Sequence, residues 1–101
     1  MIIVVASITT KPGQRAEFLD IFKANAIKVR EEDGCIEYLP TIDLDTNVAI
    51  QVRDAAVVTV VERWRDFDAL NAHFTAPHML EYRKKTKDLV AGVSLKLLQQ
   101  A

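Results

Sequence analysis

The sequence lacks the features that mark several large functional classes. Its single cysteine, Cys35, cannot form a disulfide within the chain, and we expect a buried small residue there rather than a nucleophile. The 13 basic and 14 acidic residues are spread along the chain and give a net charge of −1, so no binding to nucleic acid or anionic membranes is expected. The apolar run at residues 1–8 is too short to span a bilayer, and no positive segment precedes it as in a signal peptide. A cytoplasmic location is therefore expected.

Sequence signatures of cofactor binding are also missing. No glycine-rich loop that could hold a phosphate is present, which argues against nucleotide binding. The two histidines, His73 and His78, have no flanking cysteine and no His-x-x-x-His spacing, so they make a weak set of metal ligands. Four basic residues within 83–87 form the one basic cluster, and we expect them to be a solvated helix face. The sequence therefore predicts a protein without a metal, flavin or nucleotide.

Hydrophobic residues make up half of the 101 positions, enough for one compact domain that spans residues 1–101. Runs of β-branched and apolar residues predict strands, and apolar residues spaced by three and four predict helices. Asp66 is expected to cap one helix, and Pro77 is expected to begin the next one. The expected strands are 2–10, 35–42, 57–64 and 93–98, and the expected helices are 14–32, about 66–75 and about 77–90. This β-α-β-β-α-β order favours an α+β, ferredoxin-like antiparallel sheet with two helices on one face.

The residue pattern of the third expected strand predicts that a second copy of the chain covers one face of the sheet. Val58, Val60, Glu62 and Trp64 point to one face of the sheet, and Val57, Thr59, Val61 and Arg63 point to the other. Both faces are mostly apolar, but two helices can cover only one of them. A second copy that buries the same surface is the simplest cover, so we expect a homodimer joined sheet to sheet.

Residues 62–79 hold both histidines and the single tryptophan. His73 is next to Phe74 and should flank the buried face of its helix, where an imidazole could accept a proton near neutral pH or could simply bond to the backbone. Glu62 shares an apolar strand face, so it needs a partner: Arg63 or Arg65 of a neighbouring protomer, a histidine, or a tyrosine hydroxyl. Such a contact would be a structural ion pair or would orient a catalytic histidine.

Other side chains near this segment have open roles. His78 could contact a substrate or act as a second base, or it could cap its helix or pack against Tyr82. Trp64 is expected in the core and in a pocket wall. Tyr38 could pack similarly or donate a hydrogen bond to a ligand.

Several motifs together resemble the antibiotic biosynthesis monooxygenase domain over nearly the whole chain. They are Val4-Val5-Ala6, Lys11-Pro12-Gly13, Asp33-Gly34-Cys35, and Glu62-x-Trp64-x-Asp66-x-x-Ala69-Leu70-x-x-His73 followed by Ala76-Pro77-His78. The resemblance implies a dimeric α+β barrel in which each protomer has a pocket between its sheet and its helices. Family members include cofactor-independent oxygenases of phenols and quinols, haem-degrading enzymes and an isomerase of a small signalling molecule. The haem-degrading members use an asparagine and a histidine where this chain has Ala6 and Arg83, so that activity is not favoured.

The resemblance implies a catalytic role for His73, which would take a proton from a phenol or enol. The substrate-binding residues expected with it are Tyr38, Glu62, Trp64, Phe74, His78 and Tyr82. The leading hypothesis is a cofactor-independent monooxygenase that acts on a small hydroxylated aromatic or quinol with molecular oxygen. The alternatives are an isomerase or other proton-transfer enzyme on a small carbonyl compound, and a non-catalytic dimeric domain that binds a ligand.

One segment departs from the family pattern, because residues 43–56 lengthen the connection between the second and third strands. Val48, Ile50 and Val52 alternate with Ala49, Gln51 and Arg53 in it, which predicts a short extra strand between two turns, 45–47 and 53–55. That strand could extend the sheet edge or add a dimer contact. Alternatively, the segment could form a flap over the pocket.

Overall fold

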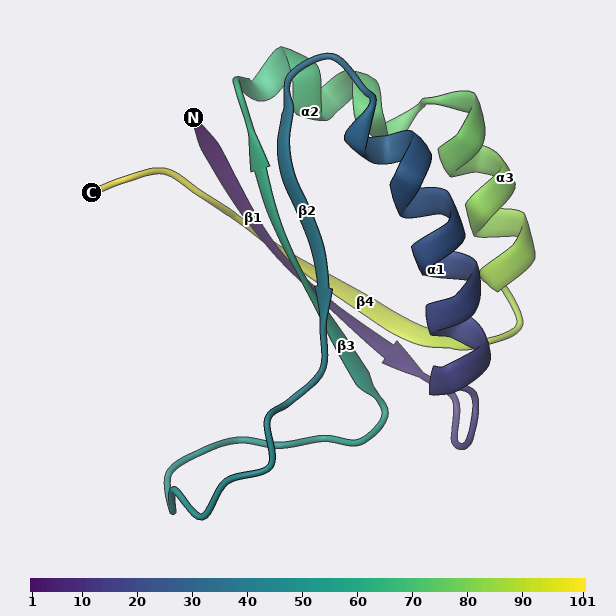
Figure 1. Ribbon diagram of the computed structural model, residues 1–101, viewed down its shortest axis with the longest axis vertical. Helices are drawn as coiled ribbons and strands as arrows, with labels where there is room; N and C mark the ends of the chain where they lie inside the picture. The colour runs from purple at the N-terminus through teal and green to yellow at the C-terminus, as the bar shows by residue number, and fades with distance from the viewer.

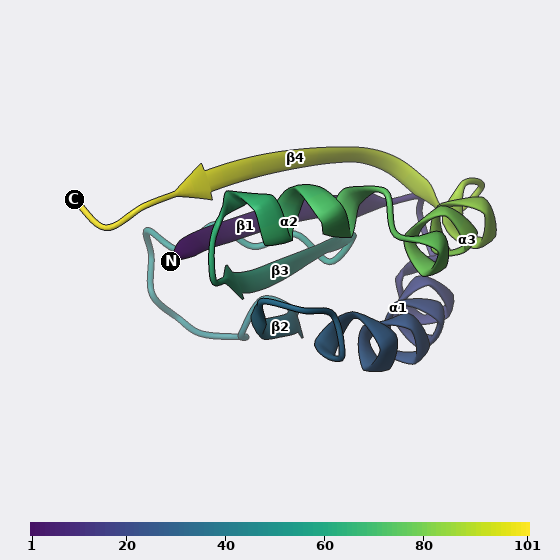
Figure 2. The same ribbon diagram turned by 90° about the horizontal axis from the view of Figure 1, so that it is seen from above.

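The computed structural model describes residues 1–101 and contains one four-stranded antiparallel sheet with helices on one face. The strands are β1 (Ile2–Thr10), β2 (Cys35–Thr41), β3 (Val57–Trp64) and β4 (Val90–Leu98), and the helices are α1 (Arg15–Arg30), α2 (Phe67–Phe74) and α3 (Pro77–Thr86). The strand order is β2-β3-β1-β4. Figure 1 shows α1 and α3 side by side, and Figure 2 shows the four strands one above another in the order β4, β1, β3, β2. The expected ferredoxin-like arrangement is confirmed, and no helix has the length and apolar character needed to cross a membrane.

The core lies between the helices and one face of the sheet. Along β1 and β3 every second residue is buried, and their register pairs Val4 with Glu62 and Ala6 with Val60. Phe18, Phe22, Ala26 and Val29 provide the buried stripe of α1; they are spaced by three or four, as an amphipathic helix requires. The opposite face of the sheet has no helix on it. The strand phase predicted for β3 is therefore confirmed.

Two turns depend on backbone conformations that suit glycine. Gly13, in the turn before α1, has φ +77°, and Gly34, before β2, has φ +85°. At Gly34 a side chain would also have no room, since a Cβ atom there would lie 2.5 Å from the Cβ of Ala69. The turn at residues 31–34 is thus held close to α2, which matters for the site described below.

Three of the expected element bounds differ clearly from the structure. The helix expected from about 14 to 32 ends at Arg30. The helix expected to reach about residue 90 ends at Thr86, and the strand expected at 93–98 begins at Val90, which pairs with Thr10 of β1. Ile27 and Phe67 are apolar residues that continue the helical spacing in the sequence, but both are exposed. The buried face of α2 is formed instead by Ala69, Leu70 and His73, which turns Phe67 outward.

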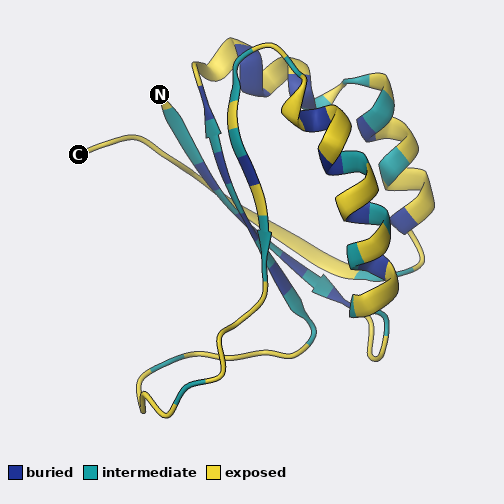
Figure 3. Cartoon of the chain, viewed as in Figure 1, coloured by how far each residue is buried: buried dark blue, intermediate teal, exposed yellow.

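The extra strand expected within 43–56 is also absent. Alternating residues form a strand only when a neighbouring strand receives their backbone hydrogen bonds, and this loop runs away from the sheet (Figure 1). It is held by its own contacts, such as Thr46 with Gln51 and Arg53 with Asp45. Figure 3 shows the loop and β4 as almost wholly exposed.

Candidate functional site

A cavity of about 480 Å³ opens between the helix-covered face of the sheet, α2 and α3. Eleven of its 16 lining residues are hydrophobic, and the hydrophobic ones come from all three helices and all four strands. The volume and the apolar lining are typical of sites for small organic molecules. The other five lining residues are Glu62, His73, Arg83, Thr86 and Lys87, and two of the hydrophobic residues, Tyr38 and Tyr82, carry a hydroxyl group.

His73 reaches the cavity wall because α2 is fixed at both ends. The carboxylate of Asp66 accepts a hydrogen bond from the backbone N–H of Ala69 at 2.9 Å, which caps the helix as expected. The helix then stops before Pro77, so His73 lies in its last turn, buried, with its ring centroid 4.7 Å from that of Trp64. His73 is thus more deeply buried than predicted, because the sequence placed it only at the flank of the buried face of its helix.

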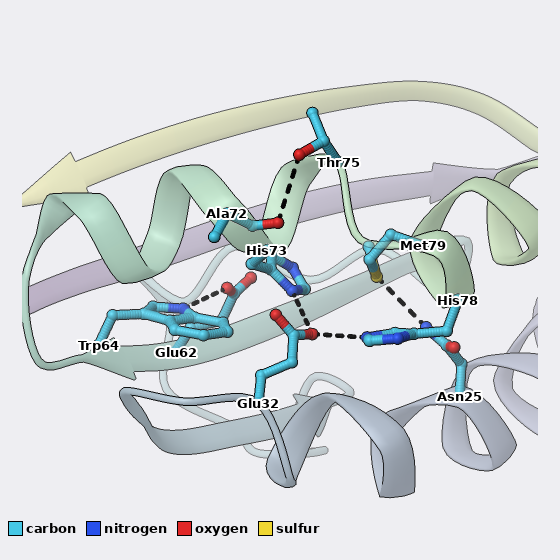
Figure 4. A network of polar contacts seen from close by, with 9 residues as sticks. All are labelled: Asn25, Glu32, Glu62, Trp64, Ala72, His73, Thr75, His78 and Met79. Atoms are coloured by element: carbon cyan, nitrogen blue, oxygen red, sulfur yellow. Dashed lines mark hydrogen bonds and ion pairs between the residues drawn. The ribbon is translucent and has the colours of Figure 1, made fainter.

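One carboxylate oxygen joins the two histidines. Glu32 Oε2 lies 2.9 Å from His73 Nδ1 and 2.7 Å from His78 Nε2, as Figure 4 shows. His73 is thus bonded to a carboxylate and not to the backbone. Burial lowers the pKa of His73, and the charges of His78 and Arg83 lower it further. The hydrogen bond to the Glu32 carboxylate and its negative charge act in the opposite direction. Neutral imidazole is therefore the favoured form of His73 at neutral pH.

Glu32 was not among the site residues predicted from the sequence. It is the last residue of the helix expected at 14–32 and the second of three consecutive acidic residues. In the structure α1 ends at Arg30, so Glu32 lies in the turn that leads to β2 and points back toward α2 and α3. The signal that could have found it is the Asp33-Gly34 turn, which ends the helix early and brings this turn against α2.

Glu62 lies in the same cavity wall, in a different environment. The indole N–H of Trp64 donates to Glu62 Oε1 at 2.9 Å, so its partner in the chain is neither a histidine nor a tyrosine hydroxyl, which were the expected choices. Burial raises the pKa of Glu62 to about 7; the Trp64 hydrogen bond opposes this shift and the Glu32 charge adds to it. A carboxyl group in this state can either give or take a proton near neutral pH.

Aromatic side chains surround the polar groups. Tyr38, Phe74 and Tyr82 line the cavity, and the ring of Tyr38 stacks on Phe22 at 5.3 Å with an interplanar angle of 7°. Burial raises the pKa of both Tyr38 and Tyr82 above the ordinary value for tyrosine, so both remain neutral phenols. They provide flat apolar walls with a polar hydroxyl, which suits an aromatic ligand that carries oxygen substituents.

All four residues of the basic cluster within 83–87 are exposed to solvent, as expected from the sequence. Arg83 and Lys87 in addition line the cavity, and Lys85 borders a smaller hollow between α1 and α3 that His78 also borders. Arg83 and Lys87 are four residues apart, so they lie on the same side of α3. Neither forms a salt bridge, so the positive charge at the cavity is not neutralised by an ion pair within the chain.

The structure places the remaining candidates outside the cavity. Trp64 is buried against Glu62 and His73, and His78 bonds to Glu32, but neither of them lines the cavity. Cys35 is half-buried, less than expected, and burial raises the pKa of its thiol to about 11, which disfavours the thiolate. No residue of 43–56 lines the cavity, and no group of three or more His, Cys, Asp or Glu side chains is arranged to hold a metal ion.

Comparison with known proteins agrees with the fold. A family profile described as antibiotic biosynthesis monooxygenase matches residues 1–85. The chain is 34% identical over 101 residues to a protein named probable quinol monooxygenase YgiN from Escherichia coli strain K12, covering 98% of this chain and 97% of the relative. Among solved structures, PA3566 from Pseudomonas aeruginosa superimposes with a TM-score of 0.83 at 25% identity, covering 99% of this chain and 93% of the other. Rv0793 from Mycobacterium tuberculosis gives a TM-score of 0.81 at 26% identity, covering 99% and 94%.

Proposed function

Because the chain belongs to the antibiotic biosynthesis monooxygenase family, we propose that it is a monooxygenase that oxidises a small quinol or related hydroxylated aromatic with molecular oxygen and no added cofactor. One observation carries the proposal. His73 lies buried in the wall of an apolar cavity, with one ring nitrogen held by Glu32 and no hydrogen bond to the other. That arrangement suits a general base for a hydroxylated aromatic substrate.

The reaction would proceed through the anion of the substrate. His73 removes the proton of a ring hydroxyl, and the electron-rich anion then reduces oxygen and forms a carbon–oxygen bond; the resulting peroxide anion takes a proton from Glu62, which yields a hydroperoxide. Glu62 takes back the C–H proton at that carbon, the O–O bond breaks as the carbon becomes a carbonyl, and the departing hydroxide takes the proton held by His73 to become water. A quinol and O₂ thus become a hydroxyquinone and H₂O, with all four electrons supplied by the quinol.

The other cavity groups favour this chemistry. The charges of Arg83 and Lys87 stabilise an anionic substrate more than a neutral one, so they assist deprotonation. Glu62, with its pKa raised to about 7, can provide a second proton where the oxygen is reduced. The largely apolar wall limits access of water to the anion and to the hydroperoxide.

We further propose that the protein works as a homodimer joined through the uncovered face of the sheet. That face presents Val5 and Val61, which pair across β1 and β3, beside Leu39 on β2. Leu39 and Leu98, near the two edges of this face, are 47% and 42% exposed. Apolar groups in such a continuous arrangement are stabilised when a second copy covers them.

The proposal is tested with an oxygen electrode and a panel of quinols and hydroxylated naphthalenes. Wild type should consume oxygen, and His73→Ala should be slower by roughly 10² or more, since general bases contribute about that factor. Asn71→Ala, at an exposed position on the same helix, is the control and should retain the wild-type rate. Equal rates for wild type and His73→Ala would remove His73 from the mechanism.

The same panel separates the alternative functions. Conversion of a carbonyl compound without oxygen uptake would identify an isomerase or another proton-transfer enzyme. A ligand that raises the melting temperature but is never converted would identify a binding protein, because binding to the folded state alone stabilises it.

A further inference from the structure

The carboxylate of Glu32 is shared by two histidines that come from different helices. Its Oε2 lies 2.9 Å from Nδ1 of His73, in the last turn of α2, and 2.7 Å from Nε2 of His78, in the first turn of α3. All three side chains are largely shielded, with exposed fractions of 13% for Glu32, 3% for His73 and 20% for His78. Figure 4 shows the carboxylate between the two rings.

This geometry determines where the hydrogen atoms lie. An ionised carboxylate oxygen only accepts hydrogen bonds, so both ring nitrogens that face Glu32 must carry a hydrogen. A neutral imidazole has one N–H group, and burial keeps His73 mainly neutral. With the hydrogen on Nδ1, the other nitrogen, Nε2, has a free lone pair.

The free nitrogen of His73 is also in the right place. Nε2 forms no hydrogen bond in the structure. Every fully buried side-chain nitrogen or oxygen has a hydrogen-bond partner, so Nε2 is not fully buried. Nε2 therefore borders open space, and the open space that His73 lines is the cavity. The lone pair faces the place where a substrate hydroxyl would be.

We propose that Glu32 is the positioning residue of the site: it fixes His73 as the Nδ1–H tautomer, so that Nε2 faces the cavity as a proton acceptor. His78 serves the positioning by bonding to the same oxygen, which stops the Glu32 side chain from turning away from His73. The proposal rests on the proposed function in one respect, namely that His73 is the base. The tautomer itself is a property of the resting protein and can be measured without turnover.

The experiment begins with NMR of protein labelled with ¹⁵N-histidine, recorded at a pH where His73 is neutral. The chain has only two histidines, so a spectrum of His78→Ala assigns both rings. In wild type we expect the ring hydrogen of His73 on Nδ1. A ring hydrogen on Nε2 in wild type would overturn the inference, whatever the activity.

Glu32→Gln then tests the positioning role. A glutamine amide can donate as well as accept, so it no longer requires a hydrogen on Nδ1, and the Nε2–H form of His73 should appear in the spectrum. The kcat for quinol oxidation should fall by roughly 10² or more with a much smaller change in KM, since loss of a tautomer-setting carboxylate costs up to about 10⁴-fold in a catalytic triad. Glu31→Gln, at the adjacent exposed position, is the matched control and should match wild type in both measurements.

The outcomes for the two proposals are separable. If Glu32→Gln keeps the wild-type tautomer and the wild-type kcat, the positioning role is refuted and the proposed function stands. If wild type shows the Nδ1–H tautomer but oxidises no quinol, the proposed function fails and the tautomer assignment stands. If Glu32→Gln does not fold, the positioning role is tested with the wild-type spectrum and with Glu32→Asp. The shorter aspartate side chain keeps the charge but cannot reach both rings.

Discussion

Replacing Glu62 with glutamine should make the protein more stable at neutral and alkaline pH. Glu62 is 6% exposed, and burial raises its pKa from 4.5 to about 7. The folded state therefore binds the proton more tightly than the unfolded state does. A glutamine has nearly the same shape and can still accept the hydrogen bond that the Trp64 indole donates at 2.9 Å, but it never ionises.

The direction of the pH effect follows from proton linkage. Below about pH 4.5 the carboxyl group is protonated in both states, and its ionisation costs the folded state nothing. As the pH rises toward 7, the unfolded chain gives up the proton while the folded protein keeps it, so the free energy of unfolding of wild type falls. Above pH 7 both states are ionised and the cost is constant.

The size of the effect is measurable. A shift from 4.5 to about 7 corresponds to about 3 kcal/mol, because each pKa unit equals about 1.4 kcal/mol. Such a difference is a large part of the total stability of an ordinary domain, which is roughly 5–15 kcal/mol. Between about pH 5 and about pH 8, the stability advantage of Glu62→Gln over wild type should grow by about 2 to 3 kcal/mol.

Urea unfolding of wild type and Glu62→Gln across this pH range provides the assay. Both proteins are measured at one protein concentration, because the stability of a dimer depends on concentration. Glu81→Gln, on the exposed side of α3, is the control for replacing a carboxyl group by an amide. An advantage of Glu62→Gln that stays constant from about pH 5 to about pH 8 would refute the reasoning, since Glu62 would then ionise equally in both states.

Two further predictions concern the fold and the assembly. Gly34→Ala should lower the free energy of unfolding by about 2 kcal/mol or more, because φ is +85° and the new Cβ would lie 2.5 Å from that of Ala69. The control Gly13→Ala, with φ +77° and no atom within 4 Å of the new Cβ, should lower it by only about 1 kcal/mol. Equal losses in urea unfolding would mean that the contact with Ala69 is unimportant. Val61→Lys, on the uncovered face of the sheet, should shift the proposed dimer toward monomer, as measured by light scattering. The control Ile27→Lys, at a 62% exposed position on α1, should not change the oligomeric state. A Val61→Lys protein that is as dimeric as wild type would place the interface elsewhere.

The fold was predictable because its signals are local or periodic. The alternation of buried residues along β3, the stripe of α1 and the cap at Asp66 each depend on residues within a few positions of one another. The segment 43–56 shows where a periodic pattern fails. Its alternating residues satisfy the local rule for a strand, but no neighbouring strand pairs with them, and pairing is a long-range property.

The site was predictable only in part, for the same reason. The cavity includes His73, Glu62, Tyr38 and Tyr82, which the family motifs and the strand and helix phases single out. The contact between Glu32 and His73 spans 41 residues, and the contact with His78 spans 46, so no local pattern reports either one. The lining role of Arg83 and Lys87 was hidden similarly, because α3 carries basic residues on several sides and only packing shows which of them border the cavity.

Glu32 and Glu62 have the same side chain and opposite effects on the chemistry available to the cavity. Glu32 is hydrogen-bonded to two imidazoles, and its carboxylate raises the pKa of His73 against the effect of burial. Glu62 has only one neutral N–H donor, so burial instead keeps a proton on it up to about pH 7. The cavity therefore contains an acceptor nitrogen and a carboxyl group that can still donate at the same pH. Because burial lowers the pKa of His73 and raises that of Glu62, proton removal and proton delivery are possible in one site, and neither role could be assigned from residue type alone.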